Sequence, residues 1–192
     1  MKSYESTYNP NIKLLAYDLC DLLLHYSGDP VFMCVGESKL VSDCLGAVVG
    51  TLLSTTYQVP CYVYGNLTHN IINENLASFY NFVKQQHPNK PIIIIDSGLG
   101  TLPQVGTVVL TQNGRIGAFT NPSAPVMGNF QLLGMVNTSG VNSLLFLKSV
   151  KLKTALNMSS FLAKAIALAL YLKNQQRSQR KQNFNLTSQL SN

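Results

Sequence analysis

The stretch Pro91–Gly100, PIIIIDSGLG, decides the fold of this 192-residue chain. Its run of β-branched isoleucines, 92–95, is too short for a buried helix and too apolar for an edge strand. Such a run is typical of a central strand in a parallel sheet that is covered on both faces. The strand leads into Asp96 and a glycine-rich turn at Gly98 and Gly100. Open α/β sheets place their functional groups in this position, beyond the carboxyl ends of the strands.

The chain before this strand alternates between helical and strand patterns with short connections. Apolar periodicity and chain-breaking residues set the limits of each element. The predicted elements are a helix over 12–25, a strand over 31–35, a helix over 43–55, a strand over 61–64 and a helix over 71–86. Because right-handed crossovers leave few alternatives, this order predicts an α/β fold, a three-layer α/β/α sandwich with a mostly parallel sheet.

Beyond Gly100 the pattern changes. Asn113-Gly114 is a strong hairpin signal, and it lies between predicted strands at 105–111 and 115–120. The remaining predicted elements are a strand at 131–136, a polar turn at 137–140 and an apolar helix at 153–172. We therefore expect a single domain over residues 1–172 and a basic, polar, disordered tail over residues 173–192.

The charge of the chain is concentrated in this tail. The net charge is +6, and the tail holds four positive charges and no acid, which leaves only +2 on residues 1–172. Basic tails are usually solvated, so we do not expect nucleic acid as a partner. The most apolar run, 161–172, is about half of the ~20 residues that a membrane span needs, so we expect no membrane. The opening MKSYESTYNP is unlike a signal peptide and the cysteines form no CxxC pair, which favours a reducing, cytoplasmic location.

Two acids are the candidates for chemistry. Asp43 precedes a predicted helix and could simply cap it, and Asp96 could simply brace the turn at Gly98. Both acids also follow parallel strands, so adjacent strands would bring them to one cleft at the same edge of the sheet. Neighbouring carboxyl groups cannot easily both ionise, and a pair that shares a proton can activate water as an acid and a base. The sequence leaves the structural and the catalytic interpretations open.

A resemblance arises at these residues. The pieces VGESKLVSDCLGAVVGTLL, VYGNLTHNIINENL, HPNKPIIIIDSGLG and QLLGMVNTSG, in this order over roughly residues 30–170, resemble the YyaC-type sporulation proteins of endospore-forming Firmicutes. Those proteins are similar to the spore germination protease and, more distantly, to the hydrogenase maturation proteases. The resemblance implies a phosphorylase/hydrolase-like fold and an atypical aspartate-dependent peptidase in which Asp43 and Asp96 are catalytic.

The resemblance also implies a setting for this activity. The substrate would be a protein or peptide, such as the small spore proteins, in the cytoplasm of the forespore, and the relatives suggest a homo-oligomer. The chain departs from the family pattern near the first aspartate, at Glu37, Ser42, Cys44 and Ala47, and in the loop 66–70. A non-catalytic sporulation protein that binds a peptide or protein partner in the same cleft is therefore the alternative. The residues expected around the pair are Glu37, Cys44, Asn66, His69, Ser97, Gly98 and Asn137.

Rival chemistries are less well matched by the sequence. Cys44 near a helix start, with His69 after the next strand, could form a thiolate–imidazole pair, but a packing role is the commoner one for such a cysteine. The hydrogenase maturation proteases hold nickel with two carboxylates and a histidine from a later loop. This chain has no histidine after His87, although His69 could substitute from a different loop. Nucleotide-binding glycine motifs are absent as well. We expect no metal and no cofactor.

Overall fold

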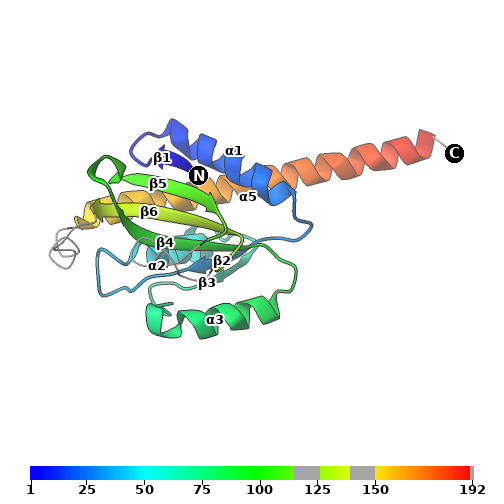
Figure 1. Ribbon diagram of the computed structural model, residues 1–192. Helices are drawn as coiled ribbons and strands as arrows, with labels where there is room; N and C mark the ends of the chain where they lie inside the picture. Colours follow the sequence, from blue (N-terminus) through cyan, green and yellow to red (C-terminus); the bar gives the residue numbers. More distant parts are fainter. Residues whose placement is uncertain (115–125, 139–149, 191–192) are drawn as a thin grey trace.

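The computed structural model describes residues 1–114, 126–138 and 150–190, which form a mixed six-stranded sheet with helices packed against it (Figure 1). The strands are β1 (Lys2–Glu5), β2 (Val31–Cys34), β3 (Tyr62–Tyr64), β4 (Ile92–Gly100), β5 (Thr107–Gln112) and β6 (Phe130–Thr138). The helices are α1 (Pro10–Leu24), α2 (Leu45–Thr51), α3 (Asn73–Gln86) and α5 (Leu152–Leu190). A π-helical turn at Leu52–Thr56 extends α2, and a short 3-10 helix occupies Leu102–Gln104.

The sheet has the order β1-β5-β6-β4-β2-β3, so β4 is an internal strand, as its isoleucines predict. β4 pairs in parallel with β2 and β6, and β2 pairs in parallel with β3. β5 runs antiparallel to β6, and β1 runs antiparallel to β5. The prediction of a mostly parallel sheet is therefore corrected to a mixed sheet. The segment 101–106 between β4 and β5 is too short for a parallel crossover, and β1 was not predicted at all.

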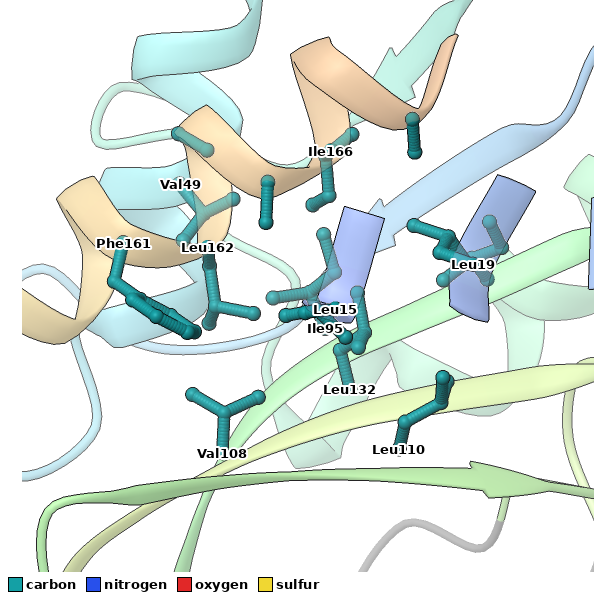
Figure 2. Close-up of a cluster of buried hydrophobic side chains, with 14 of the residues drawn as sticks. Leu15, Leu19, Val49, Ile95, Val108, Leu110, Leu132, Phe161, Leu162 and Ile166 are labelled. Carbon is teal, nitrogen blue, oxygen red and sulfur yellow. The ribbon is translucent and has the colours of Figure 1, made fainter. Parts of the chain in front are cut away.

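The two faces of the sheet carry separate apolar cores because side chains alternate along each strand. Ile93 and Ile95 of β4 belong to the larger core, which also contains buried side chains of α1, α2 and α5. Figure 2 shows this core, with Ile95 and Leu132 of the sheet lying among residues of the three helices. Ile92 and Ile94 point to the opposite face and share a smaller core with Leu76 and Val83 of α3.

Helix α5 is far longer than the predicted helix over 153–172. By length and composition alone, its stretch Leu152–Arg180 is apolar enough to cross a membrane, and 56% of the most apolar window is buried in this fold. Mostly buried helices in the cores of soluble proteins have the same length and composition. The apolar residues of α5 contact the sheet and α1 in the larger core.

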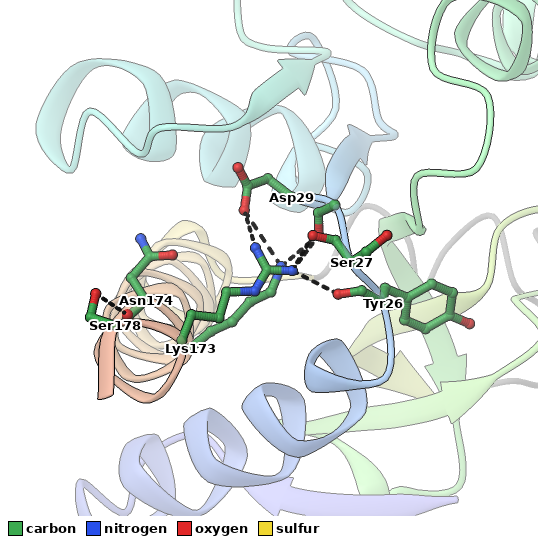
Figure 3. A network of polar contacts seen from close by, with 8 residues as sticks. Tyr26, Ser27, Asp29, Lys173, Asn174 and Ser178 are labelled. Carbon is green, nitrogen blue, oxygen red and sulfur yellow. Dashed lines mark hydrogen bonds and ion pairs between the residues drawn. The ribbon is translucent and has the colours of Figure 1, made fainter. Parts of the chain in front are cut away.

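The first residues of the predicted tail belong to the folded structure. Lys173 is fully buried, and its Nζ donates a hydrogen bond to the carbonyl of Gly28 at 2.7 Å. Figure 3 shows Lys173 of α5 beside Ser27 and Asp29 of the turn before β2. Arg177, one turn later, donates to the carbonyl of Tyr26 at 2.7 Å and forms an ion pair with Asp29 at 3.2 Å. The prediction that a disordered tail begins at residue 173 is thus wrong at its start, because basic side chains can be held by backbone carbonyls as well as by solvent.

The hairpin signal is only partly described by the structure. Asn113 has the left-handed φ of 58° that such a turn favours, and its N–H donates to the carbonyl of Asn129 at 2.9 Å. The predicted strand at 115–120 lies outside the described residues. The predicted strand at 131–136 is confirmed and continues through Thr138, while the rest of the predicted turn at 137–140 lies outside the described residues.

Candidate functional site

Asp96 lies inside β4 rather than on a turn after it. β4 continues to Gly100 because β6 supplies hydrogen-bonding partners, with Asp96 opposite Leu133 and Gly100 opposite Thr138. Asp96 is only 7% exposed. Its Oδ1 accepts the N–H of Ser97 at 2.7 Å, and not that of Gly98. The interpretation of Asp96 as a brace for a turn at Gly98 is therefore wrong.

Asp43 closes the loop that follows β2. The N–H of Glu37 donates both to the backbone carbonyl of Asp43, at 3.1 Å, and to its carboxylate Oδ2, at 3.0 Å. Gly36 makes this closure possible: it has a φ of +146°, and a Cβ at this position would lie 2.0 Å from the Asp43 carbonyl oxygen. Helix α2 has Cys44 as its N-cap, without a side-chain cap. The interpretation of Asp43 as an N-cap is therefore wrong.

The start of α2 lies unusually close to the sheet. A Cβ on Gly46 would lie 2.0 Å from the carbonyl oxygen of Val35 and 2.7 Å from that of Ile95. Glycine at this position lets the helix start directly over the end of β2 and the middle of β4. The same approach brings the residue before the helix N-cap, Asp43, to Ser97 in β4.

Ser97 connects the two acids. Its N–H donates to Asp96 Oδ1 at 2.7 Å, and its hydroxyl donates to Asp43 Oδ1 at 3.3 Å. The hydroxyl contact joins residues that are 54 positions apart in the sequence. The structure thus brings Asp43, Asp96, Ser97 and the backbone of Glu37 to one place, beyond the end of β2 and beside the middle of β4.

Both acids have raised pKa values. Burial, reinforced by the negative charge of Asp43, raises the pKa of Asp96 to about 8, although the Ser97 N–H opposes the shift. Burial also raises the pKa of Asp43, and there the Glu37 N–H and the Ser97 hydroxyl oppose it. Near neutral pH, Asp96 therefore retains its proton. The pair consists of one protonated and one more readily ionised carboxyl group.

A second loop supports the Asp43 loop from the side of β3. The side-chain oxygen of Asn70 accepts hydrogen bonds from the Ser38 N–H, at 3.2 Å, and from the Ser38 hydroxyl, at 2.9 Å. Asn66 accepts the N–H groups of Thr68 and His69 within its own loop. Sequence reasoning missed Ser38 and Asn70, since nothing in their spacing shows that the two loops meet.

Several predicted site residues have other roles or places. Cys44 is buried and donates to the carbonyl of Val41, and burial raises the pKa of its thiol, so it is not poised as a thiolate nucleophile. His69 is exposed in the loop after β3. Gly98 leaves room for Leu133, which a Cβ would approach to 2.9 Å. Asn137 pairs across the ladder with Leu99, and its side chain accepts the N–H of Thr138.

Two neighbouring carboxyl groups with different protonation are suited to acid–base chemistry. No group of three histidine, cysteine or acidic side chains suited to a metal ion occurs among the described residues. Three pockets lined by described residues have volumes of about 580, 350 and 460 Å³ and share His25, at the end of α1. None of these three includes Asp43 or Asp96, so the predicted cleft is not one of them.

The fold and site together define an α/β protein in which a partly buried aspartate after one internal strand and a buried aspartate within the next both contact Ser97. The chain belongs to the family described as "Protein of unknown function (DUF1256)", which it matches over residues 4–165. It is similar to "Uncharacterized protein YyaC" of Bacillus subtilis (strain 168), with 28% identity over 144 residues, which cover 74% of this chain and 70% of the relative. These similarities confirm the resemblance to the YyaC-type proteins. They assign no activity.

Proposed function

We propose that this protein is a sporulation-associated peptidase of the germination-protease type, in which Asp43 and Asp96 hydrolyse a peptide bond. The observation that carries the proposal is the meeting of the two carboxyl groups at Ser97, with the pKa of Asp96 raised to about 8 by burial and by the charge of Asp43. Acid–base catalysis needs one group that accepts a proton and one that donates it near the working pH.

The proposed reaction uses one water molecule and restores both carboxyl groups. The ionised carboxylate takes a proton from water, and the water oxygen attacks the peptide carbonyl carbon. The protonated carboxyl group then donates its proton to the peptide nitrogen as the C–N bond breaks. The proton taken from water passes back between the two groups, so that the net products are a carboxylic acid and an amine.

The arrangement of helices around the sheet supports a relationship to known peptidases. The described helices pack on both faces of the sheet, with α1, α2 and α5 on one face and α3 on the other. We propose that this arrangement is a three-layer, phosphorylase/hydrolase-like fold shared with the germination protease and the hydrogenase maturation proteases. A cytoplasmic location in the forespore and small spore proteins as substrates are part of the same proposal.

One observation favours the alternative, a non-catalytic protein that binds a peptide or protein partner at this place. Each carboxyl group accepts a backbone N–H, Asp43 from Glu37 and Asp96 from Ser97. Backbone donors of this kind also stabilise acids with purely structural roles. The raised pKa of Asp96 favours the peptidase, because structural carboxylates that are well hydrogen-bonded usually have lowered pKa values.

The test is cleavage of purified small spore proteins by the full chain between pH 5 and 8, with new termini identified by mass spectrometry. Asp43→Asn and Asp96→Asn should each reduce the cleavage rate by at least about 100-fold. Asp21→Asn, an exposed acid of α1, is the matched control and should leave the rate unchanged. If the full chain binds these proteins without cleaving them, and the two variants abolish that binding, the non-catalytic alternative replaces the peptidase.

A further inference from the structure

Ser97 occupies a special position between the two acids. It gives a different hydrogen bond to each of them, the backbone N–H to Asp96 at 2.7 Å and the hydroxyl to Asp43 at 3.3 Å. The backbone donor is independent of the side chain at position 97. The hydroxyl donor is the part of this arrangement that a substitution can remove selectively.

The two acids receive unequal numbers of donors. Asp43 accepts two hydrogen bonds at its carboxylate, from the Glu37 N–H and the Ser97 hydroxyl, and it is only partly buried. Asp96 accepts one, from the Ser97 N–H, and is 7% exposed. Donors stabilise the ionised form of a carboxyl group, and burial stabilises the neutral form. Both differences favour the charge on Asp43 and the proton on Asp96.

The other titratable groups around the pair do not reverse this preference. The carboxylate of Glu37 repels negative charge on Asp43 but does so from the loop, where solvent screens it. The Cys44 thiol beside Asp43 donates to the Val41 carbonyl, and burial raises its pKa, so it remains neutral. The hydroxyl of Ser97 is thus a neutral donor that can hold the charge on Asp43.

We infer that Ser97 is a positioning residue that decides which of the two acids is ionised, its hydroxyl holding Asp43 as the carboxylate and leaving the proton on Asp96. This inference deepens the proposed function and rests on it for its catalytic meaning. Asp43 is then the base that takes the proton from water, and Asp96 is the acid that donates to the peptide nitrogen. The roles follow from which group holds the proton before the substrate binds.

The test is an NMR titration of the full-length protein that carries ¹³C-labelled aspartate, from pH 3 to pH 10. The Cγ signals of positions 43 and 96 are assigned with Asp43→Asn and Asp96→Asn. In the parent protein Asp43 should titrate first and Asp96 last. Ser97→Ala should raise the pKa of Asp43 by about 1 unit and bring the two titrations closer together. Ser97→Thr keeps a hydroxyl and should restore the separation.

Two results would overturn the inference: both titrations unchanged in Ser97→Ala, or Asp96 titrating before Asp43 in the parent protein. If Ser97→Ala does not fold, Ser97→Cys keeps the volume with a weaker donor, and a shift of Asp43 in the same direction is required. The titration needs no substrate, so it is separate from the peptidase proposal. Expected titrations without cleavage would reject the peptidase alone, and cleavage with unchanged titrations would reject the role of Ser97 alone.

Discussion

Asp96 shows how a single buried side chain can oppose the stability of the fold that holds it. Burial and the charge of Asp43 raise its pKa to about 8 in the folded protein, whereas an aspartate in an unfolded chain has a pKa of about 3.9. Between these values the folded protein holds a proton that the unfolded chain has released. The free energy of unfolding therefore falls as the pH rises from about 4 to about 8.

Asp96→Asn should remove this pH dependence. The asparagine oxygen can still accept the Ser97 N–H, and the side chain no longer has a charge to desolvate. At pH 8 we expect the variant to exceed the parent in free energy of unfolding by roughly 1–3 kcal/mol. Urea titrations at pH 5 and pH 8 measure this difference. A variant that loses stability at pH 8, or keeps the slope of the parent between the two pH values, would contradict the pKa shift.

Gly46 is the residue that most limits the approach of α2 to the sheet. Alanine is normally better than glycine within a helix by about 1 kcal/mol. Here its Cβ would lie 2.0 Å from the Val35 carbonyl oxygen and 2.7 Å from that of Ile95, and backbone atoms cannot easily move. We expect Gly46→Ala to lower the free energy of unfolding by roughly 3 kcal/mol.

The matched control for this substitution is Gly28→Ala. A Cβ on Gly28 would meet only Lys90 Cγ, at the ordinary contact distance of 3.5 Å. Its effect on chemical denaturation should be small by comparison. Equal effects of the two substitutions would mean that α2 does not approach the sheet as closely as described.

At the scale of elements, α5 packs in the core and also forms polar contacts with the turn between α1 and β2. Its apolar half packs in the larger core, and beyond it Lys173 and Arg177 contact the carbonyls and the acid of residues 26–29. These contacts fix the turn from which β2 starts (Figure 3). Helix α5 therefore stabilises residues 26–29, which are far from it in the sequence.

Substitution of Arg177 by alanine should weaken the attachment of α5 to this turn. The Arg177 guanidinium donates to the carbonyls of Tyr26 and Ser27, and its removal leaves these carbonyls to solvent. We expect the free energy of unfolding to fall by roughly 1–3 kcal/mol. Arg180→Ala, at an exposed position one turn further along α5, should change it by less than about 0.5 kcal/mol. Thermal unfolding of both variants measures the difference. Equal shifts of Tm would contradict a stabilising role for the Arg177 contacts.

At the scale of the whole molecule, the two faces of the sheet are unequally covered. The larger core contains buried residues of α1, α2 and α5, and the smaller core contains those of α3. Regions with fewer buried apolar contacts open at lower free energy. The face covered by α3 is thus expected to open before the face covered by α5.

Native-state hydrogen exchange can measure the free energy at which each face of the sheet opens. We expect amides in the middle of α3 to exchange through an opening of lower free energy than amides of α5 between residues 155 and 170. Leu162→Ala in the larger core should cost roughly 3–5 kcal/mol of global stability. Leu76→Ala, in the smaller core, should cost less and accelerate exchange mainly in α3. Uniform exchange across both helices would show that the two cores open as one unit.

Local patterns predicted most of the elements because apolar periodicity and chain breakers act over a few neighbouring residues. The isoleucines of β4 and the helical patterns of α1 and α3 were read correctly. The ends of two strands were predicted less well. The glycines and polar residues of 96–100 and 137–138 predict turns, but β4 and β6 pair with each other there and both continue as strands. A strand partner distant in the sequence can override the turn preference of glycine.

The sequence by itself determined an α/β protein with an internal strand of isoleucines, and it marked Asp43 and Asp96 as the acids that neighbouring parallel strands would bring together. Only the tertiary structure decided that both acids meet at Ser97, that the sheet is mixed, and that Lys173 and Arg177 belong to the fold. The physical reason is the range of the interactions. Periodicity and turn preference are local, whereas burial, hydrogen bonding and charge between distant residues exist only once the chain has packed.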